Sequence, residues 1–233
     1  MLDHFQRIYA RHAEQYEALV AREDYQGRLL PALAAICPLA GARVVEMGAG
    51  TGRLTRLLAP HVRSILAMDA SRHMLGHAAG LIRRDGFANI SLAVADNRHL
   101  PVGDGVADLS LQGWSFGHFT EWYPDVWRAE IGRAVDEMLR VLRPGGSAII
   151  LETLGTGSET PAPPAESLAA YYDYLEAERG FARTWLRTDY RFESLAEAES
   201  LARFFFGDDL ADRVVREGWV ILPECTGVWW RER

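Results

Sequence analysis

The stretch Val44-Val45-Glu46-Met47-Gly48-Ala49-Gly50-Thr51-Gly52 decides the fold of this chain of 233 residues. Residues 43–47 are typical of a strand that is covered on both faces. The glycines that follow tolerate positive φ and let the backbone approach a ligand closely. A helix expected at about 52–59 would add free N–H groups and the positive end of its dipole. Alone, such a turn also occurs where a strand leads into a helix and nothing binds.

Two acidic residues follow the next two expected strands. Asp69 ends the apolar run 65–69, where its carboxylate could accept hydrogen bonds from both hydroxyls of a ribose or simply cap a helix. Asp96, with Asn97 beside it, ends the strand expected at 89–95, where it could meet an adenine amino group or lie in a solvated turn. Ligands of open α/β sheets bind at the carboxyl ends of the strands, so we expect these side chains to converge.

Strands and helices alternate over about 110 residues, which predicts a doubly wound α/β fold with a mostly parallel, seven-stranded, Rossmann-like sheet. We expect N-terminal helices, a helix at 165–179, and a C-terminal strand that adds an antiparallel edge. Further strands are expected at 106–112, 147–152, 183–192 and 220–230, the last one interrupted by Pro223. Further helices are expected at 4–20, 24–36, 72–84, 124–141 and 194–205.

Composition bounds the class of protein. Apolar residues make up 48% of the chain, enough for a sizeable core, and the net charge of -7 argues against nucleic acid as the main partner. Cys37 and Cys225 show neither the spacing of a metal site nor a disulfide framework, which favours a reduced, cytoplasmic setting. The N-terminus does not read as a signal peptide, and we expect no membrane span.

Taken in this order, the features resemble those of the class I S-adenosylmethionine-dependent methyltransferases over about residues 40–153. The glycine stretch is similar to the family's first motif, Asp69 to its ribose-binding acid, and Asp96 to its adenine-contacting acid. Leu142-Arg143-Pro144-Gly145-Gly146 is similar to the element that precedes the family's fifth strand. The resemblance implies S-adenosyl-L-methionine as the cofactor and S-adenosyl-L-homocysteine as its product.

The resemblance also implies a role for particular residues. Glu46 would face the methionine part of the cofactor, Asp69 would hold the ribose, and Asp96 would meet the adenine edge. The full set expected to bind the cofactor is Tyr16, Glu46, Gly48, Ala49, Gly50, Gly52, Asp69, Ala70, Met74, Asp96, Asn97, Gln112, Gly113 and Trp114. A nicotinamide dinucleotide is the rival ligand, but its usual loop is Gly-x-Gly-x-x-Gly, and Glu46 would repel its pyrophosphate.

The acceptor is expected over the ends of the fourth and fifth strands, below residues 1–35, 113–123 and 153–182. The 113–123 loop holds five aromatic residues, which suit a planar or apolar small molecule or equally a packing role. His118 is the candidate general base, because its ordinary pKa lies near neutrality, although a structural histidine fits as well. The candidate acceptor-binding residues are Trp114, Phe116, His118, Tyr171 and Tyr172.

We therefore expect one methyltransferase domain over 1–233. Its parts would be an N-terminal cap (1–38), a cofactor-binding core (40–153), an acceptor-covering insert (154–182) and C-terminal strands with a helix (183–233). An enzyme that methylates a small molecule by in-line displacement is favoured. A catalytically silent cofactor-binding scaffold and a nicotinamide-dependent oxidoreductase are the alternatives. The methylated atom, the acceptor, the pathway and the oligomeric state stay open.

Overall fold

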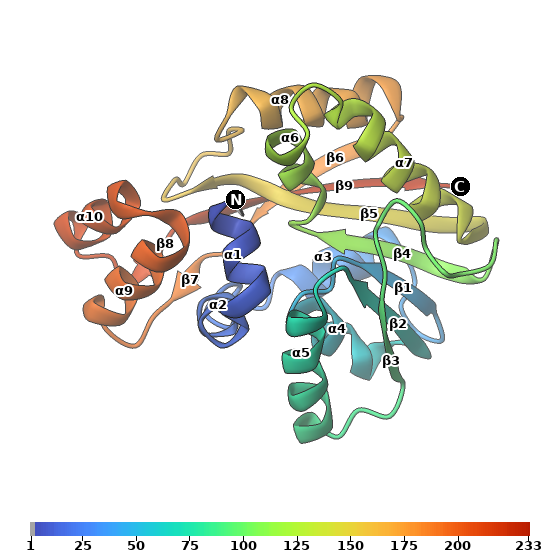
Figure 1. Cartoon of the computed structure of the whole chain (residues 1–233), viewed down its shortest axis with the longest axis horizontal. Helices are drawn as coiled ribbons and strands as arrows, with labels where there is room; N and C mark the ends of the chain where they lie inside the picture. Colours follow the sequence, from blue (N-terminus) through green and yellow to red (C-terminus); the bar gives the residue numbers. More distant parts are fainter. Residues whose placement is uncertain (1–2) are drawn as a thin grey trace.

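One seven-stranded sheet organises the computed structural model, which describes residues 3–233 (Figure 1). The strand order is β3-β2-β1-β4-β5-β9-β6, and β1 to β5 are parallel. The bounds are β1 Arg43–Met47, β2 Ser64–Asp69, β3 Ile90–Val94, β4 Ala107–Gly113, β5 Leu142–Thr156, β6 Ala182–Arg187 and β9 Glu224–Glu232. The predicted doubly wound sheet is confirmed. The antiparallel strand β9 lies one place in from the edge, because β6 pairs along its outer side.

Helices cover both faces of this sheet, so neighbouring strand residues are buried in different cores. Val44 and Ile149 pack in the cluster on one face, whereas the adjacent Val45 and Ile150 pack in the cluster on the other. This two-sided burial explains why the strands are nearly unbroken apolar runs. The helices of this core are α3 Leu29–Ile36, α4 Arg53–Leu58, α5 Arg72–Asp85 and α7 Trp127–Arg140.

A smaller lobe stands beyond the carboxyl ends of the strands (Figure 1). The strand expected at 183–192 is divided between β6 and the short β7, and the strand expected at 220–230 is divided at Pro223 into β8 and β9. Thr188, between β6 and β7, donates its backbone N–H to the Glu224 carbonyl and thereby holds the two lobes together. The lobe consists of β7 Tyr190–Arg191, β8 Ile221–Leu222, α9 Leu195–Phe206 and α10 Asp208–Glu217, of which α10 was not predicted.

The N-terminal segment bridges the sheet and the small lobe. The single helix expected at 4–20 is two helices, α1 His4–Arg11 and α2 Ala13–Val20, with a break at His12. Leu19 is fully buried in a third apolar cluster that belongs to the small lobe. In Figure 1 the two helices lie between that lobe and α5. They therefore cover the edge of the sheet at which the strands end.

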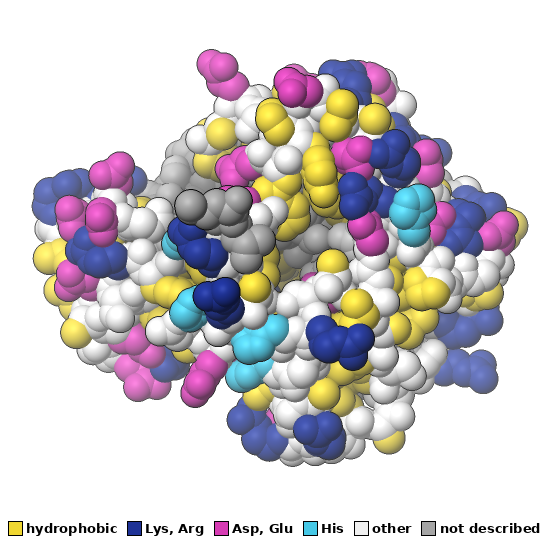
Figure 2. Space-filling model, in the orientation of Figure 1, with side chains coloured by type: hydrophobic (Ala, Val, Ile, Leu, Met, Phe, Trp, Pro, Cys, Tyr) yellow, Lys and Arg dark blue, Asp and Glu magenta, His cyan; other side chains and the backbone are white. Residues whose placement is uncertain are grey.

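The helix expected at 165–179 is formed by α8 Glu166–Asp173 and a π-helical turn, Tyr174–Glu178. In the view of Figure 2, hydrophobic side chains gather in a hollow between the N-terminal helices and the region of α6 (Phe119–Trp122) and α7. Acidic and basic side chains alternate over the rest of that face. Within residues 3–233, no helix combines the length and the apolar character that a membrane crossing requires.

Candidate functional site

The glycine turn after β1 needs its glycines for two reasons. Gly48, Gly50 and Gly52 all have positive φ, a backbone conformation that residues with a side chain rarely adopt. A Cβ on Gly48 would also lie 2.3 Å from the Ser115 Oγ, far inside van der Waals contact. The backbone of the turn after β1 therefore packs directly against the Ser115 side chain of the loop after β4. This contact fixes the floor of the site.

Asp69, at the tip of β2, is held in place by backbone N–H groups. Its Oδ2 accepts from the Gly50 N–H at 2.8 Å, and its Oδ1 accepts from the Ser71 N–H at 2.7 Å. Burial raises the pKa of this carboxyl, while the same two hydrogen bonds lower it. Each oxygen has a further lone pair for a ligand, since a carboxylate offers about four acceptor positions.

These residues line a cavity of about 460 Å³, here called the strand-end cavity. Ten of the fourteen residues expected at the cofactor lie in its wall: Tyr16, Gly48, Gly50, Asp69, Ala70, Met74, Asp96, Asn97, Gly113 and Trp114. Gln6, Tyr9, Ala10, Ser71, Ser115, Phe119 and Trp122 complete the lining. The structure therefore brings together most of the set that the resemblance implied.

The other four expected residues lie outside this lining. Glu46 is buried and accepts a hydrogen bond of 2.6 Å from the Thr55 hydroxyl, and burial raises its pKa to about 7. Ala49 donates its backbone N–H to the Met68 carbonyl, and Gly52 is the N-cap of α4. Gln112 bridges the Ser115 N–H and the Glu152 carboxylate. These residues support the wall rather than form it.

Asp96 and Asn97 have different surroundings, although both line the cavity. The Asp96 carboxylate forms an ion pair with Arg98, whose side-chain Nε donates to it at 2.8 Å, and this pairing holds the pKa of Asp96 below its ordinary value. The Asn97 amide donates to the Ser115 hydroxyl at 3.0 Å, but its buried Oδ1 has no hydrogen-bond partner among residues 3–233. The unpartnered acceptor at this strand end is therefore Asn97.

Trp114 separates the strand-end cavity from a second one. It has a φ of 53°, in the left-handed region that a bulky residue rarely adopts. Its backbone N–H donates to the Leu151 carbonyl at 2.7 Å, and the Arg53 guanidinium lies 3.8 Å from the centre of its ring. A strained backbone conformation of this kind persists only where the surrounding contacts enforce it. Here it places the Trp114 indole in the wall that both cavities share.

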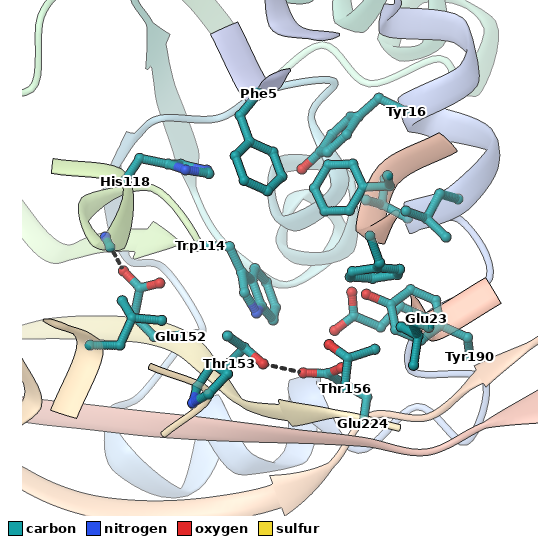
Figure 3. A pocket seen from close by; sticks show the side chains of 18 of the residues that line it. Phe5, Tyr16, Glu23, Trp114, His118, Glu152, Thr153, Thr156, Tyr190 and Glu224 are labelled. Carbon is teal, nitrogen blue, oxygen red and sulfur yellow. Dashed lines mark hydrogen bonds between the residues drawn. The ribbon is translucent and has the colours of Figure 1, made fainter. Parts of the chain in front are cut away.

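The second cavity, here called the acidic cavity, has a volume of about 450 Å³ (Figure 3). It shares Tyr9, Tyr16 and Trp114 with the strand-end cavity. Its apolar wall consists of Phe5, Leu19, Val20, Pro164, Ala165, Leu168, Phe205, Phe206 and Leu210. Its remaining lining residues are Glu23, Arg53, Gly117, His118, Glu121, Glu152, Thr153, Thr156, Tyr190 and Glu224.

Glu23 and Arg53 form an ion pair in the wall of the acidic cavity, so their charges offset one another. Glu224 differs from Glu23: it is 2% exposed, its Oε1 accepts from the Thr153 hydroxyl at 2.7 Å, and its Oε2 has no partner among residues 3–233. Burial, followed by repulsion from Glu23, raises the pKa of Glu224. Figure 3 shows these acids and Tyr190 grouped on one side of the cavity.

Glu152, in the last third of β5, is the other buried acid of this cavity. Its Oε1 accepts from the Gln112 amide and from the Gly117 N–H, both at 3.0 Å, and from the Tyr171 hydroxyl at 3.5 Å. Burial raises its pKa to about 7 despite these donors. Since Gln112 also holds the loop that carries Trp114, Glu152 is fixed relative to the shared wall.

His118 lies in the acidic cavity, as expected, but not as a free base. Its Nε2 is 2.8 Å from the Tyr9 hydroxyl, and its ring stacks on Trp122 with centroids 5.0 Å apart. Burial lowers its pKa to about 4, so the imidazole is neutral at physiological pH and only weakly basic. Its structural contacts account for its position.

Three of the residues expected at the acceptor lie elsewhere. Phe116 is fully buried in the core of the sheet. Tyr171 and Tyr172 point into that core, where the Tyr172 hydroxyl donates to the Thr153 carbonyl at 2.7 Å. The aromatic spacing reflected packing of α8 on the sheet, and these side chains are absent from the lining of both cavities.

The sequence reasoning missed the acids of the second cavity. Glu23, Glu152 and Glu224 come from three distant segments and share no motif. One local signal was available, because Glu152 is the last residue of the strand expected at 147–152, just as Asp69 is the last residue of β2. Glu224 follows Pro223 in a segment whose sequence is unusual for a terminal strand, but nothing in that sequence indicated a role for this acid.

Known proteins share this fold and part of this sequence. Residues 45–150 match the model of a methyltransferase domain family. A demethylmenaquinone methyltransferase of Clavibacter sepedonicus is 30% identical over 144 residues, which are 61% of this chain and 51% of that protein. A malonyl-[acyl-carrier protein] O-methyltransferase of Methylococcus capsulatus is 35% identical over 107 residues, 45% of this chain and 35% of the relative. The matches thus span about half of the first relative and about a third of the second.

Solved structures extend the likeness in fold to nearly the whole chain. The YcgJ protein of Bacillus subtilis has a TM-score of 0.60 at 16% identity and covers 90% of this chain and 99% of its own. A Haemonchus contortus phosphoethanolamine N-methyltransferase has a TM-score of 0.62 at 16% identity, and the match covers 100% of this chain and 61% of that protein. The matched domain and the sheet order support the resemblance to the class I S-adenosylmethionine-dependent methyltransferases and S-adenosylmethionine as the cofactor.

Proposed function

We propose that this protein transfers a methyl group from S-adenosyl-L-methionine to a small-molecule acceptor, an activity of the EC 2.1.1 type. The observation that carries the proposal is the pairing of two cavities across one wall. The strand-end cavity holds the glycine turn and Asp69, and the acidic cavity lies behind Tyr9, Tyr16 and Trp114. A donor and an acceptor held on the two sides of that wall would be neighbours. Such positioning is the main requirement of a transfer between two bound molecules.

The residues of the strand-end cavity suit this cofactor. Asp69 would accept from the ribose hydroxyls, because Gly50 and Ser71 already hold its carboxylate in position. The unpartnered Oδ1 of Asn97 would accept from the adenine amino group. The bare backbone at Gly48 and Gly50 would admit the remainder of the molecule. The bound cofactor supplies an electrophilic methyl group on a cationic sulfur.

A small acceptor is supported by the size and the walls of the acidic cavity. A volume of about 450 Å³ lies within the roughly 300–1,000 Å³ of small-molecule sites. The α1–α2 segment and residues 164–168 contribute to its lining, so the proposed N-terminal cap and acceptor-covering insert both enclose it. The names of the two relatives indicate a quinone precursor and a malonyl group on a carrier protein as their acceptors. Location in the cytoplasm is part of the proposal, supported by two free, buried cysteines.

Calorimetry and a turnover assay test the proposal in sequence. The full chain should bind S-adenosyl-L-homocysteine and should not prefer NADH, which would indicate the oxidoreductase alternative. With S-adenosyl-L-methionine and a pool of small metabolites, it should then release S-adenosyl-L-homocysteine faster than without the pool. Cofactor binding without turnover on any pool would favour the catalytically silent scaffold. Absence of cofactor binding would refute the proposal.

A further inference from the structure

The acidic cavity contains more carboxyl groups than the arginine in its lining can neutralise. Glu23, Glu152 and Glu224 line it, and its arginine is Arg53. Arg53 is committed to Glu23 in an ion pair and to the Trp114 ring by stacking. Two buried carboxyl groups therefore face the cavity without a cationic partner among its lining residues. A buried charge of this kind is costly unless it is paired, so such a site favours a ligand that carries the missing charge.

Glu224 supplies an independent sign of a ligand at this place. It is 2% exposed and lines the cavity, yet its Oε2 has no hydrogen-bond partner among residues 3–233. Most buried polar side-chain atoms are hydrogen-bonded, so an unpartnered carboxylate oxygen beside a cavity marks the position of a donor. Figure 3 shows Glu224 beside Glu23, Thr156 and Tyr190 on the side of the cavity that lies away from His118.

The groups around Glu224 come from several elements, and they leave its environment acidic. Glu23 lies after α2, Asp189 between β6 and β7, and Tyr190 on β7. Asp189 is held by Arg187 and accepts the backbone N–H of Glu224 at 3.0 Å. Arg53 is the cation that faces this group, and its ion pair with Glu23 offsets its charge. A cation that entered from the cavity would therefore meet attraction rather than repulsion.

The apolar and aromatic residues of the lining determine which uncharged part of a ligand fits the cavity. The rings of Phe5, Tyr16, Trp114, Phe205 and Phe206 and three leucine side chains form an apolar and aromatic part of the wall. Aromatic faces attract ammonium groups and also pack well against apolar or planar groups. A ligand with an apolar body and one ammonium group thus matches both parts of the cavity. A carboxylate or a phosphate would instead face the unpaired acids.

We propose that the acceptor of this protein is an amine with an apolar or aromatic body, recognised as its ammonium ion by Glu224, so that the enzyme is an N-methyltransferase. This inference rests on the proposed function. Before transfer, the ammonium group gives one proton to a carboxylate of the cavity. The neutral nitrogen then forms the new N–C bond with its lone pair, while the C–S bond to the donated methyl group breaks and its electrons go to sulfur. The methylated product leaves as an ammonium ion, and the carboxyl group then releases the first proton to solvent.

The test compares three probes of similar shape and different charge on the full chain saturated with S-adenosyl-L-homocysteine. Phenethylamine is cationic, 2-phenylethanol is neutral and 3-phenylpropionate is anionic. Methylamine and tryptamine extend the amine series to smaller and larger bodies. Binding is measured by calorimetry, so the result does not depend on turnover. We expect at least one amine to bind at least about tenfold more tightly than both matched probes, a difference of about 1.4 kcal/mol.

Two variants identify the residue responsible. Glu224→Gln keeps the shape of the side chain but removes its charge and one of its acceptor oxygens, and it should remove the preference for the amine over 2-phenylethanol. Glu14→Gln, on the exposed face of α2, removes an equal charge from the surface and should keep that preference. Both variants should bind S-adenosyl-L-homocysteine as the unmodified protein does, which also reports that they are folded.

The outcomes separate the two proposals. Binding of 2-phenylethanol or 3-phenylpropionate as tightly as the best amine, an unchanged preference in Glu224→Gln, or no binding by any amine would overturn the amine assignment. Each of these results leaves the methyltransferase proposal standing, because S-adenosyl-L-homocysteine is already bound. Failure of the unmodified chain to bind S-adenosyl-L-homocysteine would instead refute the proposed function on which the inference rests.

Discussion

The strand-end cavity and the acidic cavity have nearly equal volumes, about 460 and 450 Å³, but they are built differently. The first is formed mainly by the ends of parallel strands, and its central acid is held by backbone N–H groups. The second is formed by side chains from both ends of the chain and from the middle. The contrast shows that the fold itself fixes the first site, whereas the second depends on which residues the added segments carry.

The acids of the two cavities show the same difference in their partners. Both oxygens of Asp69 accept backbone hydrogen bonds, which would be present in any chain with this turn. Glu152 and Glu224 depend on donors such as Gln112 and Thr153, and burial raises the pKa of both. A site made from backbone is less sensitive to substitution of its neighbours. A site made from buried side chains can acquire a new ligand through few changes.

The largest effect is expected from Gly48→Ala, which attacks the backbone-built site. Its new Cβ would lie 2.3 Å from the Ser115 Oγ at a φ of 67°. Overpacking and strain together should lower the free energy of unfolding by about 2–4 kcal/mol. Gly41→Ala is the matched control, because Gly41 has a φ of 78° and no atom within 4 Å of the added Cβ. Equal losses in denaturant titrations of the two variants would contradict the role given to Ser115.

Asp69→Ala should have the next largest effect, this time on cofactor affinity. Loss of charge-assisted hydrogen bonds should weaken S-adenosyl-L-homocysteine binding by about 1.5–3 kcal/mol. Asp69→Asn retains the shape but not the charge and should fall between the alanine variant and the unmodified protein. Calorimetry measures all three. An unchanged affinity in a folded Asp69→Ala protein would show that the cofactor is held elsewhere.

The acidic cavity should make the stability of the protein depend on pH. Glu224 has an ordinary pKa of 4.5 when unfolded and a raised pKa when folded, so the folded state binds more protons between these two values. Stability must therefore fall as pH rises through that window, by about 1.4 kcal/mol for each pKa unit of elevation. Glu224→Gln removes this contribution, so its stability relative to the unmodified chain should improve from about pH 5 to about pH 9.

Denaturant titrations across that pH range measure the difference between the two proteins. Glu46 and Glu152, which have raised pKa values, and His118, whose lowered pKa acts with the opposite sign, are present in both and largely cancel. Glu14→Gln provides the control for simple loss of a surface acid. Parallel stability curves for Glu224→Gln and the unmodified chain would mean that Glu224 titrates normally in the folded state.

The smallest effect is expected at Ser71, which lines the strand-end cavity beside α1. Ser71 caps α5 by accepting from the Met74 N–H at 3.2 Å, and it donates to the Tyr9 carbonyl of α1 at 2.7 Å. Ser71→Ala should cost about 1 kcal/mol of stability. Ser194→Ala removes the corresponding cap of α9 and should cost about as much. Only Ser71→Ala should also weaken S-adenosyl-L-homocysteine binding in calorimetry. Equal affinities in both variants would show that α1 is positioned independently of this hydroxyl.

The sequence was most informative where function follows secondary structure. A strand end is visible in the chain, and parallel strands bring their ends to one edge, so Asp69 and Asn97 were found without coordinates. The prediction weakened where neighbours decide the role of a residue. Asp96 and Asn97 looked like partners, but Arg98 engages Asp96 and leaves the Asn97 acceptor unpartnered. His118 looked like a base, but its burial against Tyr9 and Trp122 lowers its pKa.

By itself, the sequence determined the doubly wound sheet, the class of protein and most of the strand-end cavity, because these depend on local patterns. Only the tertiary structure decided the acidic cavity. It brought Glu224 to within hydrogen-bonding distance of Thr153, 71 residues away in the chain. It also buried Tyr171 and Tyr172 in the core. Burial and long-range pairing set the charge and the partners of these side chains, and no local pattern in the chain encodes either property.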